Sequence, residues 1–155
     1  MNNFTENIKQ NNLISKIKQF FFSNGWEPLP YQIESWQAFL NGENGIIQVP
    51  TGCGKTYAAL MGPLSKIDDP KNNKGVNILL ITPLKALSRD LKNSIQLAAL
   101  HFNKDITVEI RNGDTTPYEK KKQLSRPPNI LITTPESLSL LLSNKKSNNL
   151  FKELS

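Results

Sequence analysis

Cysteine and histidine are almost absent from this chain of 155 residues, which contains one of each, Cys53 and His101. A single thiol excludes an internal disulfide, and without a second cysteine or a histidine cluster the sequence offers no zinc site. No window reaches eighteen apolar residues, and no basic stretch followed by an apolar core opens the chain. Neither a membrane-spanning helix nor a secretory leader is therefore predicted, and we expect a soluble cytoplasmic protein.

Acidic side chains are in the minority. Thirteen aspartates and glutamates stand against nineteen lysines and arginines, which gives a formal net charge of +6. This balance favours contact with a polyanion such as nucleic acid, although lysine, asparagine and isoleucine share adenine- and thymine-rich codons, so genome composition alone could supply it. The length fits one compact α/β domain. We expect residues 12–155 to form it, after a polar, disordered segment at 1–11.

The most informative stretch is Gly45 to Thr56, which reads GIIQVPTGCGKT. Its β-branched part, 46–49, suits a buried parallel strand, and the glycines let backbone N–H groups turn inward at the positive end of the following helix. In such loops the lysine ammonium reaches nucleotide phosphates, and the next hydroxyl holds a magnesium ion. Lys55 and Thr56 fit these roles. The alternative, a glycine-rich turn without a ligand, leaves both side chains unexplained.

The rest of the chain alternates between helical and extended patterns. Expected helices are 12–25, 30–42, 57–66, 85–101, 119–124 and 134–142, and further strands are 76–81, 106–110 and 129–133. This alternation predicts a parallel sheet with helices on both faces. Because parallel strands end at the same edge, Thr82, Gly113 and Thr133 are expected on the same side as the phosphate loop.

That edge carries donors for a single-stranded nucleic-acid backbone, which needs no base-specific contacts. The donors are helix N-termini, the hydroxyls of Thr82, Thr115, Thr133 and Thr134, and the charged groups of Lys85, Arg89 and Arg111.

The loop and three later motifs resemble those of superfamily 2 helicases. Val49 replaces the first glycine of the common G-x-x-x-x-G-K-[ST] pattern, and the Pro-Thr-Gly variant that results is similar to theirs. TPLKALSRDL at 82–91, RNGDT at 111–115 and PPNILITTPESLSLLL at 127–142 resemble motif Ia, the glycine-containing motif and motif Ib of Lhr-type helicases. The opening GWEPLPYQIESW resembles the ligase-associated DExH-box branch. Together the resemblance covers roughly residues 20–150.

The resemblance implies a P-loop NTPase fold of the RecA-like type, with ATP and Mg²⁺ as cofactors and single-stranded DNA as partner, RNA or a hybrid being alternatives. Gln32 would recognise adenine, since a side-chain amide matches the N7 and N6 edge of that base; without the loop downstream it would be only a solvated or capping residue. The phosphates would be bound by Thr51, Gly52, Cys53, Gly54, Lys55 and Thr56, with Lys55 and Thr56 catalytic and Thr56 on the metal. The nucleic acid would be held by Thr82, Pro83, Lys85, Arg89, Arg111, Gly113, Asp114, Thr115, Thr133 and Thr134.

Two parts of the family's machinery have no counterpart in this sequence. There is no Asp-Glu-x-His strand, whose carboxylates organise magnesium and activate water, and no second RecA-like domain with arginine fingers, which are worth about 10³- to 10⁵-fold in rate. We therefore expect the intact family protein to couple ATP hydrolysis to movement along single-stranded DNA. We expect this chain, truncated before that strand, to bind nucleotide weakly and hydrolyse almost none.

Two alternatives remain: a non-catalytic module that binds ATP or single-stranded DNA, and an inactive remnant of a broken helicase gene. A thermal melt distinguishes them, because a remnant with an incomplete sheet should fold poorly.

Overall fold

The computed structural model describes residues 2–72, 74–83 and 85–154, without the side chains of 2–5, 85–88 and 146. These residues form two compact units, Met1–Asp68 and Asp69–Ser155, where the sequence predicted one domain. Each unit has its own helices and its own buried core. No helix in the described parts of the chain has the length and apolar character needed to cross a membrane.

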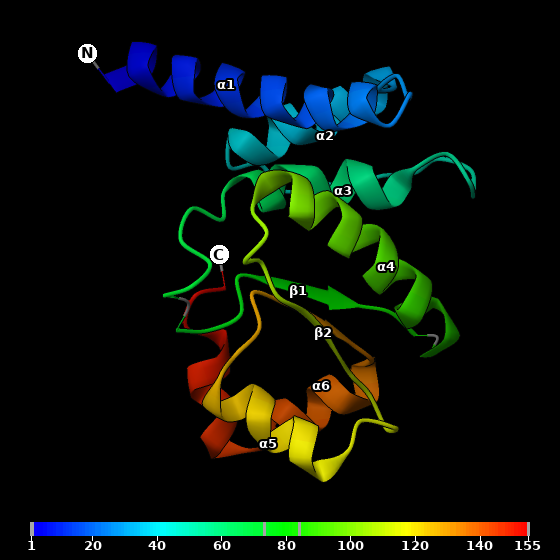
Figure 1. Cartoon of the computed structure of the whole chain (residues 1–155), viewed down its shortest axis with the longest axis vertical. Coiled ribbons are helices and arrows are strands. Elements are labelled where there is room, and N and C mark those ends of the chain that lie inside the picture. The colour runs from blue at the N-terminus through cyan, green and yellow to red at the C-terminus, as the bar shows by residue number, and fades with distance from the viewer. Residues whose placement is uncertain (1, 73, 84, 155) are drawn as a thin grey trace. The chain divides into compact units, whose positions relative to one another are not determined.

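The first unit consists of three helices, α1 (Asn2–Ser23), α2 (Pro30–Leu40) and α3 (Lys55–Ser65) (Figure 1). Aromatic side chains fill the space between them. The rings of Phe21 and Trp36 lie 5.2 Å apart, and that of Tyr57 lies 5.9 Å from Phe21. Helix α1 starts at Asn2, so almost all of the segment expected to be disordered is helical.

The strand predicted at 46–49 is not formed. Residues 43–50 have no regular secondary structure, and the side chain of Ile46 is 93% exposed. A strand needs a neighbour for its backbone hydrogen bonds, and every described strand lies in the second unit and pairs there. The β-branched run therefore has the sequence pattern of a strand, but it forms no strand pairing within the first unit.

The second unit is built on a three-stranded parallel sheet. Its strands are β1 (Ile78–Ile81), β2 (Val108–Arg111) and β3 (Ile130–Thr133), in the order β1-β3-β2. Ile130 of β3 is in register with Ile78 on one side and Val108 on the other. All four residues of β3 are buried, as expected for a central strand covered on both faces.

Helices cover both faces of this sheet. Helix α4 (Lys85–Phe102) lies on one face, and α5 (Pro117–Ser125) and α6 (Pro135–Leu142) lie on the other (Figure 1). The 3₁₀ helix η1 (Lys145–Phe151) packs against α5 and α6. The predicted α/β class, with a parallel sheet between helices, is confirmed.

The helices α5 and α6 begin where the sequence provides caps. The hydroxyl of Thr116 accepts a hydrogen bond from the backbone N–H of Glu119 at 3.2 Å, and the Glu119 carboxylate accepts one from the N–H of Thr116 at 2.9 Å. The hydroxyl of Thr116 also donates to the Glu119 carboxylate at 2.7 Å, and this bond, together with the one from the N–H of Thr116, lowers the pKa of Glu119. Thr134 caps α6 with a single such bond to the backbone, its hydroxyl accepting from Ser137 N–H at 3.4 Å. A proline follows each cap, so the helix directions at the carboxyl edge of the sheet are set locally.

Candidate nucleotide and nucleic-acid sites

The phosphate loop of the first unit turns at two glycines. Gly52 and Gly54 have φ angles of +83° and +81°, a region that glycine occupies at little cost, and Gly54 is the N-cap of α3. The ammonium of Lys55 donates hydrogen bonds to the backbone carbonyls of Val49 at 2.6 Å and Pro50 at 2.8 Å. The cation therefore lies against the loop at the N-terminal end of α3, and its predicted contact with phosphates stays a prediction.

Gln32 joins the start of α2 to this loop. Its side chain is 3% exposed; Oε1 accepts a hydrogen bond from the backbone N–H of Leu29 at 2.9 Å, and Nε2 donates one to the carbonyl of Gly54 at 3.1 Å. One donor and one acceptor position of the buried amide are thus used within the protein. The adenine-reading role of Gln32 stays a prediction.

Tyr31 and Trp36 support the same region, through bonds to the loop and to the start of α3 that the sequence does not specify. The hydroxyl of Tyr31 donates to the carbonyl of Cys53, and the indole of Trp36 donates to the carbonyl of Tyr57 at 2.9 Å. Burial, with a smaller contribution from Cys53, raises the pKa of Tyr31, so its hydroxyl remains a neutral donor at physiological pH. The sequence signal for this arrangement is the aromatic residue Tyr31 directly before Gln32, in the first turn of α2.

In the second unit, the strand ends predicted to carry nucleic-acid contacts do meet. The N–H of Thr82 donates to the carbonyl of Thr133 at 2.9 Å, and the hydroxyl of Thr133 donates to the carbonyl of Arg111 at 2.8 Å. Thr133 and Thr134 are buried, and their hydroxyls form internal bonds, Thr134 as the cap of α6. A phosphate oxygen could accept from the hydroxyl of Thr133 only by displacing the carbonyl of Arg111, and the predicted contact role of Thr133 and Thr134 remains untested.

Arg111 and the loop after it are also held by internal bonds. The guanidinium of Arg111 donates to the carbonyl of Lys120 at 3.0 Å and to Oε1 of Gln123 at 3.2 Å. Burial lowers the pKa of Arg111, which nevertheless stays protonated at neutral pH. The hydroxyl of Thr115 accepts from Asn112 N–H at 2.9 Å, while Gly113 and Asp114 are exposed at the turn. Arg111 therefore anchors α5 to β2.

A cleft of about 690 Å³ opens beside this loop, between α4, β2 and α5. Of the predicted residues, Arg89, Asp114 and Thr115 line it, and so do two lysines that the sequence reasoning missed, Lys92 and Lys122. Pro83 is exposed, and the side chain of Lys85 lies outside the described residues. The predicted nucleotide-binding residues all belong to the first unit, and the predicted nucleic-acid residues all belong to the second.

Residues 29–155, which include both groups, match the family model of the DEAD/DEAH box helicases. The chain belongs to this family. It is 33% identical over 139 residues to the Lhr helicase/probable uracil glycosylase of Mycolicibacterium smegmatis, an alignment that covers 82% of this chain and 9% of that protein. It is 40% identical over 115 residues to the ATP-dependent helicase Lhr-Core of Sulfolobus acidocaldarius, covering 68% of this chain and 13% of the relative.

Among solved structures, this chain resembles Mycobacterium smegmatis helicase Lhr bound to single-stranded DNA and AMP-PNP. The TM-score is 0.78 at 31% identity, over 89% of this chain and 19% of that one. The predicted resemblance to Lhr-type superfamily 2 helicases is confirmed, and so is the RecA-like fold class. The ligase-associated branch stays a prediction. The chain spans only 9 to 13% of the length of the two curated relatives above.

The helicase's two loop glycines should respond differently to alanine. Each substitution should cost about 1 to 2 kcal/mol, because alanine disfavours the left-handed region. A Cβ at Gly54 would also lie 2.7 Å from Nε2 of Gln32, whereas one at Gly52 would meet no atom within 4 Å. Gly54→Ala should therefore lose roughly 1 kcal/mol more, the value of the displaced hydrogen bond. Urea unfolding followed by tryptophan fluorescence measures both, since both tryptophans lie in the first unit.

The matched control is Gln32→Ala, alone and combined with each glycine substitution. The extra loss should disappear when Gln32→Ala is combined with Gly54→Ala and should not depend on Gly52→Ala. Equal losses for the two glycine variants would contradict a close approach between Gly54 and Gln32.

Proposed function

We propose that this helicase segment binds ATP with Mg²⁺ in the loop from Thr51 to Thr56, and single-stranded nucleic acid at the carboxyl edge of the second unit's sheet. The position of the Lys55 ammonium against the loop, at the start of α3, is the observation that carries the nucleotide part. The nucleic-acid part rests on the meeting of three strand ends beside a cleft lined by Arg89, Lys92 and Lys122. The Lhr neighbour bound to single-stranded DNA and AMP-PNP supports both.

The residues present fit a magnesium-bound triphosphate. The first turn of α3 has N–H groups without intrahelical partners, which suit anionic oxygens, and Lys55 adds a full positive charge. Thr56 offers a hydroxyl oxygen, the ligand type that Mg²⁺ prefers. When bound, the metal ion neutralises charge on the phosphates.

The protein's own side chains would hold and orient the nucleotide. Lys55 would exchange its bonds to the carbonyls of Val49 and Pro50 for stronger, charge-assisted bonds to phosphate oxygens. Tyr31 and Gln32 would keep the loop backbone in place through Cys53 and Gly54. In the intact family protein, we propose that hydrolysis of this ATP drives movement along the nucleic-acid strand.

Lys55→Ala tests the proposal. It should weaken binding of a fluorescent ATP analogue in the presence of Mg²⁺ by about 10- to 100-fold, the value of one or two lost charge-assisted hydrogen bonds. Fluorescence titration of the full chain measures the dissociation constant. Lys9→Ala, which removes the same charge from an exposed position on α1, is the control and should bind as the wild type does. Unchanged affinity in the Lys55 variant would exclude this loop as the nucleotide site.

A further inference from the structure

A second cleft of the helicase opens at the amino edge of the sheet, the edge opposite the proposed nucleic-acid surface. Its volume is about 600 Å³, and its walls come from the segments that lead into the three strands. Pro70 and Lys71 precede β1, Lys104 and Asp105 precede β2, and residues 126–128 precede β3. Pro127 and Pro128 open the stretch that resembles motif Ib, and the other residues named here lie outside the helicase motifs of the sequence.

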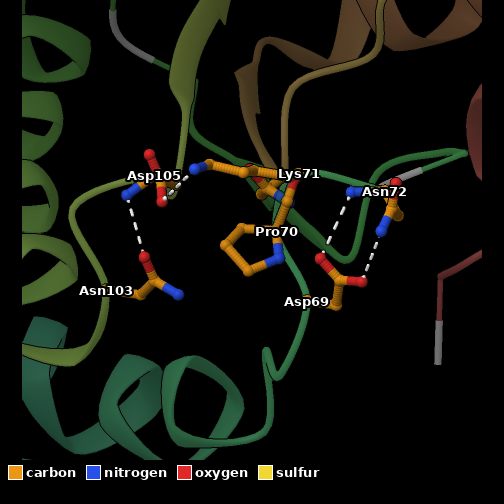
Figure 2. Close-up of polar contacts among 7 residues, drawn as sticks. Asp69, Pro70, Lys71, Asn72, Asn103 and Asp105 are labelled. Atoms are coloured by element: carbon orange, nitrogen blue, oxygen red, sulfur yellow. Dashed lines mark hydrogen bonds and ion pairs between the residues drawn. The ribbon is translucent and has the colours of Figure 1, made fainter.

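The cleft carries an excess of positive charge. Lys71, Lys104, Lys122 and Arg126 line it, against the carboxylates of Asp105 and Glu109. Figure 2 shows that one carboxylate is already paired: Nζ of Lys71 lies 3.2 Å from Oδ2 of Asp105. In the described part of the chain, the exposed side chains of Lys104 and Arg126 have no hydrogen bond or ion pair. Two cations are thus available to an anionic ligand.

The walls of the cleft are fixed before any ligand arrives. Figure 2 shows Asn72 bonded to the Asp69 carboxylate, by its side chain at 2.7 Å and its N–H at 3.4 Å, and the N–H of Asp105 bonded to Asn103 at 3.0 Å. The side chain of Asn129 donates to the carbonyl of Pro70 at 3.2 Å. Together with the prolines, these bonds hold the cleft walls in place, so a ligand that binds there costs the walls little conformational entropy.

This cleft adjoins the one at the carboxyl edge. Glu109 and Lys122 line both, so the two clefts are neighbours beside β2 and α5. We propose that the amino-edge cleft binds the phosphodiester backbone of a nucleic-acid strand, as a second contact for the strand held at the carboxyl edge. The adjacency of the two clefts favours a nucleic acid over an acidic polypeptide, because one strand that contacts the carboxyl-edge cleft can extend to the amino-edge cleft. The inference depends on the proposed function only in assuming that the same strand is also bound at the carboxyl edge.

The test compares two pairs of substitutions in the full chain. Lys104→Ala with Arg126→Ala removes the available cations of the cleft; Lys145→Ala with Lys152→Ala removes the same charge from exposed positions at η1 and just after it. Binding of a fluorescein-labelled oligothymidylate is measured by anisotropy over a salt series. The cleft pair should weaken binding several-fold and reduce the slope of log K against log salt by about 1.4, roughly 0.7 for each lost phosphate contact. The η1 pair should leave both values near wild type.

A third variant, Arg89→Ala in the carboxyl-edge cleft, separates this inference from the proposed function. If Arg89→Ala weakens binding and the cleft pair behaves like the η1 pair, the amino-edge assignment is wrong and the proposed surface stands. If only the cleft pair weakens binding, the inference stands and the carboxyl-edge surface is wrong. Absence of oligothymidylate binding by the wild type overturns both. Binding of a polyglutamate peptide that depends on Lys104 and Arg126, without such dependence for oligothymidylate, assigns the cleft to an acidic polypeptide and overturns the inference.

Discussion

Replacing Trp36 with alanine should lower the free energy of unfolding of the first unit by about 3 to 5 kcal/mol, the usual range for removing a large buried aromatic side chain. Trp36 is fully buried between helices, with its ring 5.2 Å from that of Phe21. The substitution also removes the indole donor to the carbonyl of Tyr57, at the start of α3. Urea denaturation followed by the fluorescence of the remaining tryptophan, Trp26, measures the loss.

Two further variants divide this effect into its parts. Trp36→Phe keeps most of the packing but removes the donor, so it should lose less than Trp36→Ala. Trp26→Ala removes an aromatic ring of the same cluster that is 43% exposed, and should cost much less than Trp36→Ala. If the alanine variants at 26 and 36 lose equal stability, Trp36 does not organise the core that supports the phosphate loop.

Asn129→Leu should destabilise the second unit by about 3 kcal/mol, because it leaves buried donors and acceptors without partners. The side chain is 1% exposed, and its Oδ1 accepts two bonds at 2.9 Å, from the N–H and the hydroxyl of Thr107. Its Nδ2 donates to the carbonyl of Pro70 and to Oδ1 of Asn77, each at 3.2 Å. One amide thus ties together the segments that enter all three strands. Urea unfolding followed by far-ultraviolet circular dichroism measures the loss.

Asn72→Ala is the matched control for that experiment. Asn72 is an exposed asparagine of the neighbouring turn, bonded only to Asp69 among the contacts described above, and its loss should cost well under 1 kcal/mol. Similar losses at positions 72 and 129 would mean that the bonds of Asn129 do not stabilise the strand entries.

The sequence predicted the parts of the fold that local pattern determines. The strands around Ile78, Val108 and Ile130 and the helix α6 lie close to where periodicity and turn residues predicted them. The run 46–49 failed as a strand because strand formation depends on a partner, which local sequence does not supply. The sequence predicted disorder at 1–11 because this segment is rich in asparagine, a weak helix former, whereas α1 already begins at Asn2. A tertiary bond from the side chain of Gln10 to the carbonyl of Leu40, 3.1 Å long, helps to hold that segment.

In the candidate sites, too, local sequence predicted some features and tertiary packing decided the others. Lys55 lies against the loop because its bonding partners, the carbonyls of Val49 and Pro50, are only a few residues away in the sequence. The direction of a side chain is not encoded in this way: Thr133 and Arg111 stand at the predicted edge, but each is bonded within the protein. Residue types at strand ends therefore identify an edge of the sheet, and tertiary packing decides which of them face a ligand.

The side-chain amide of Gln32 reaches the entry of α2 with one atom and the start of α3 with another. A ligand that competes for either bond changes the freedom of the segment at the other end. Thermodynamic linkage makes this influence mutual and equal in free energy. If the proposed function holds, occupation of the phosphate loop and occupation of the surface around Gln32 would therefore be coupled, and the affinity measured for one would depend on the state of the other.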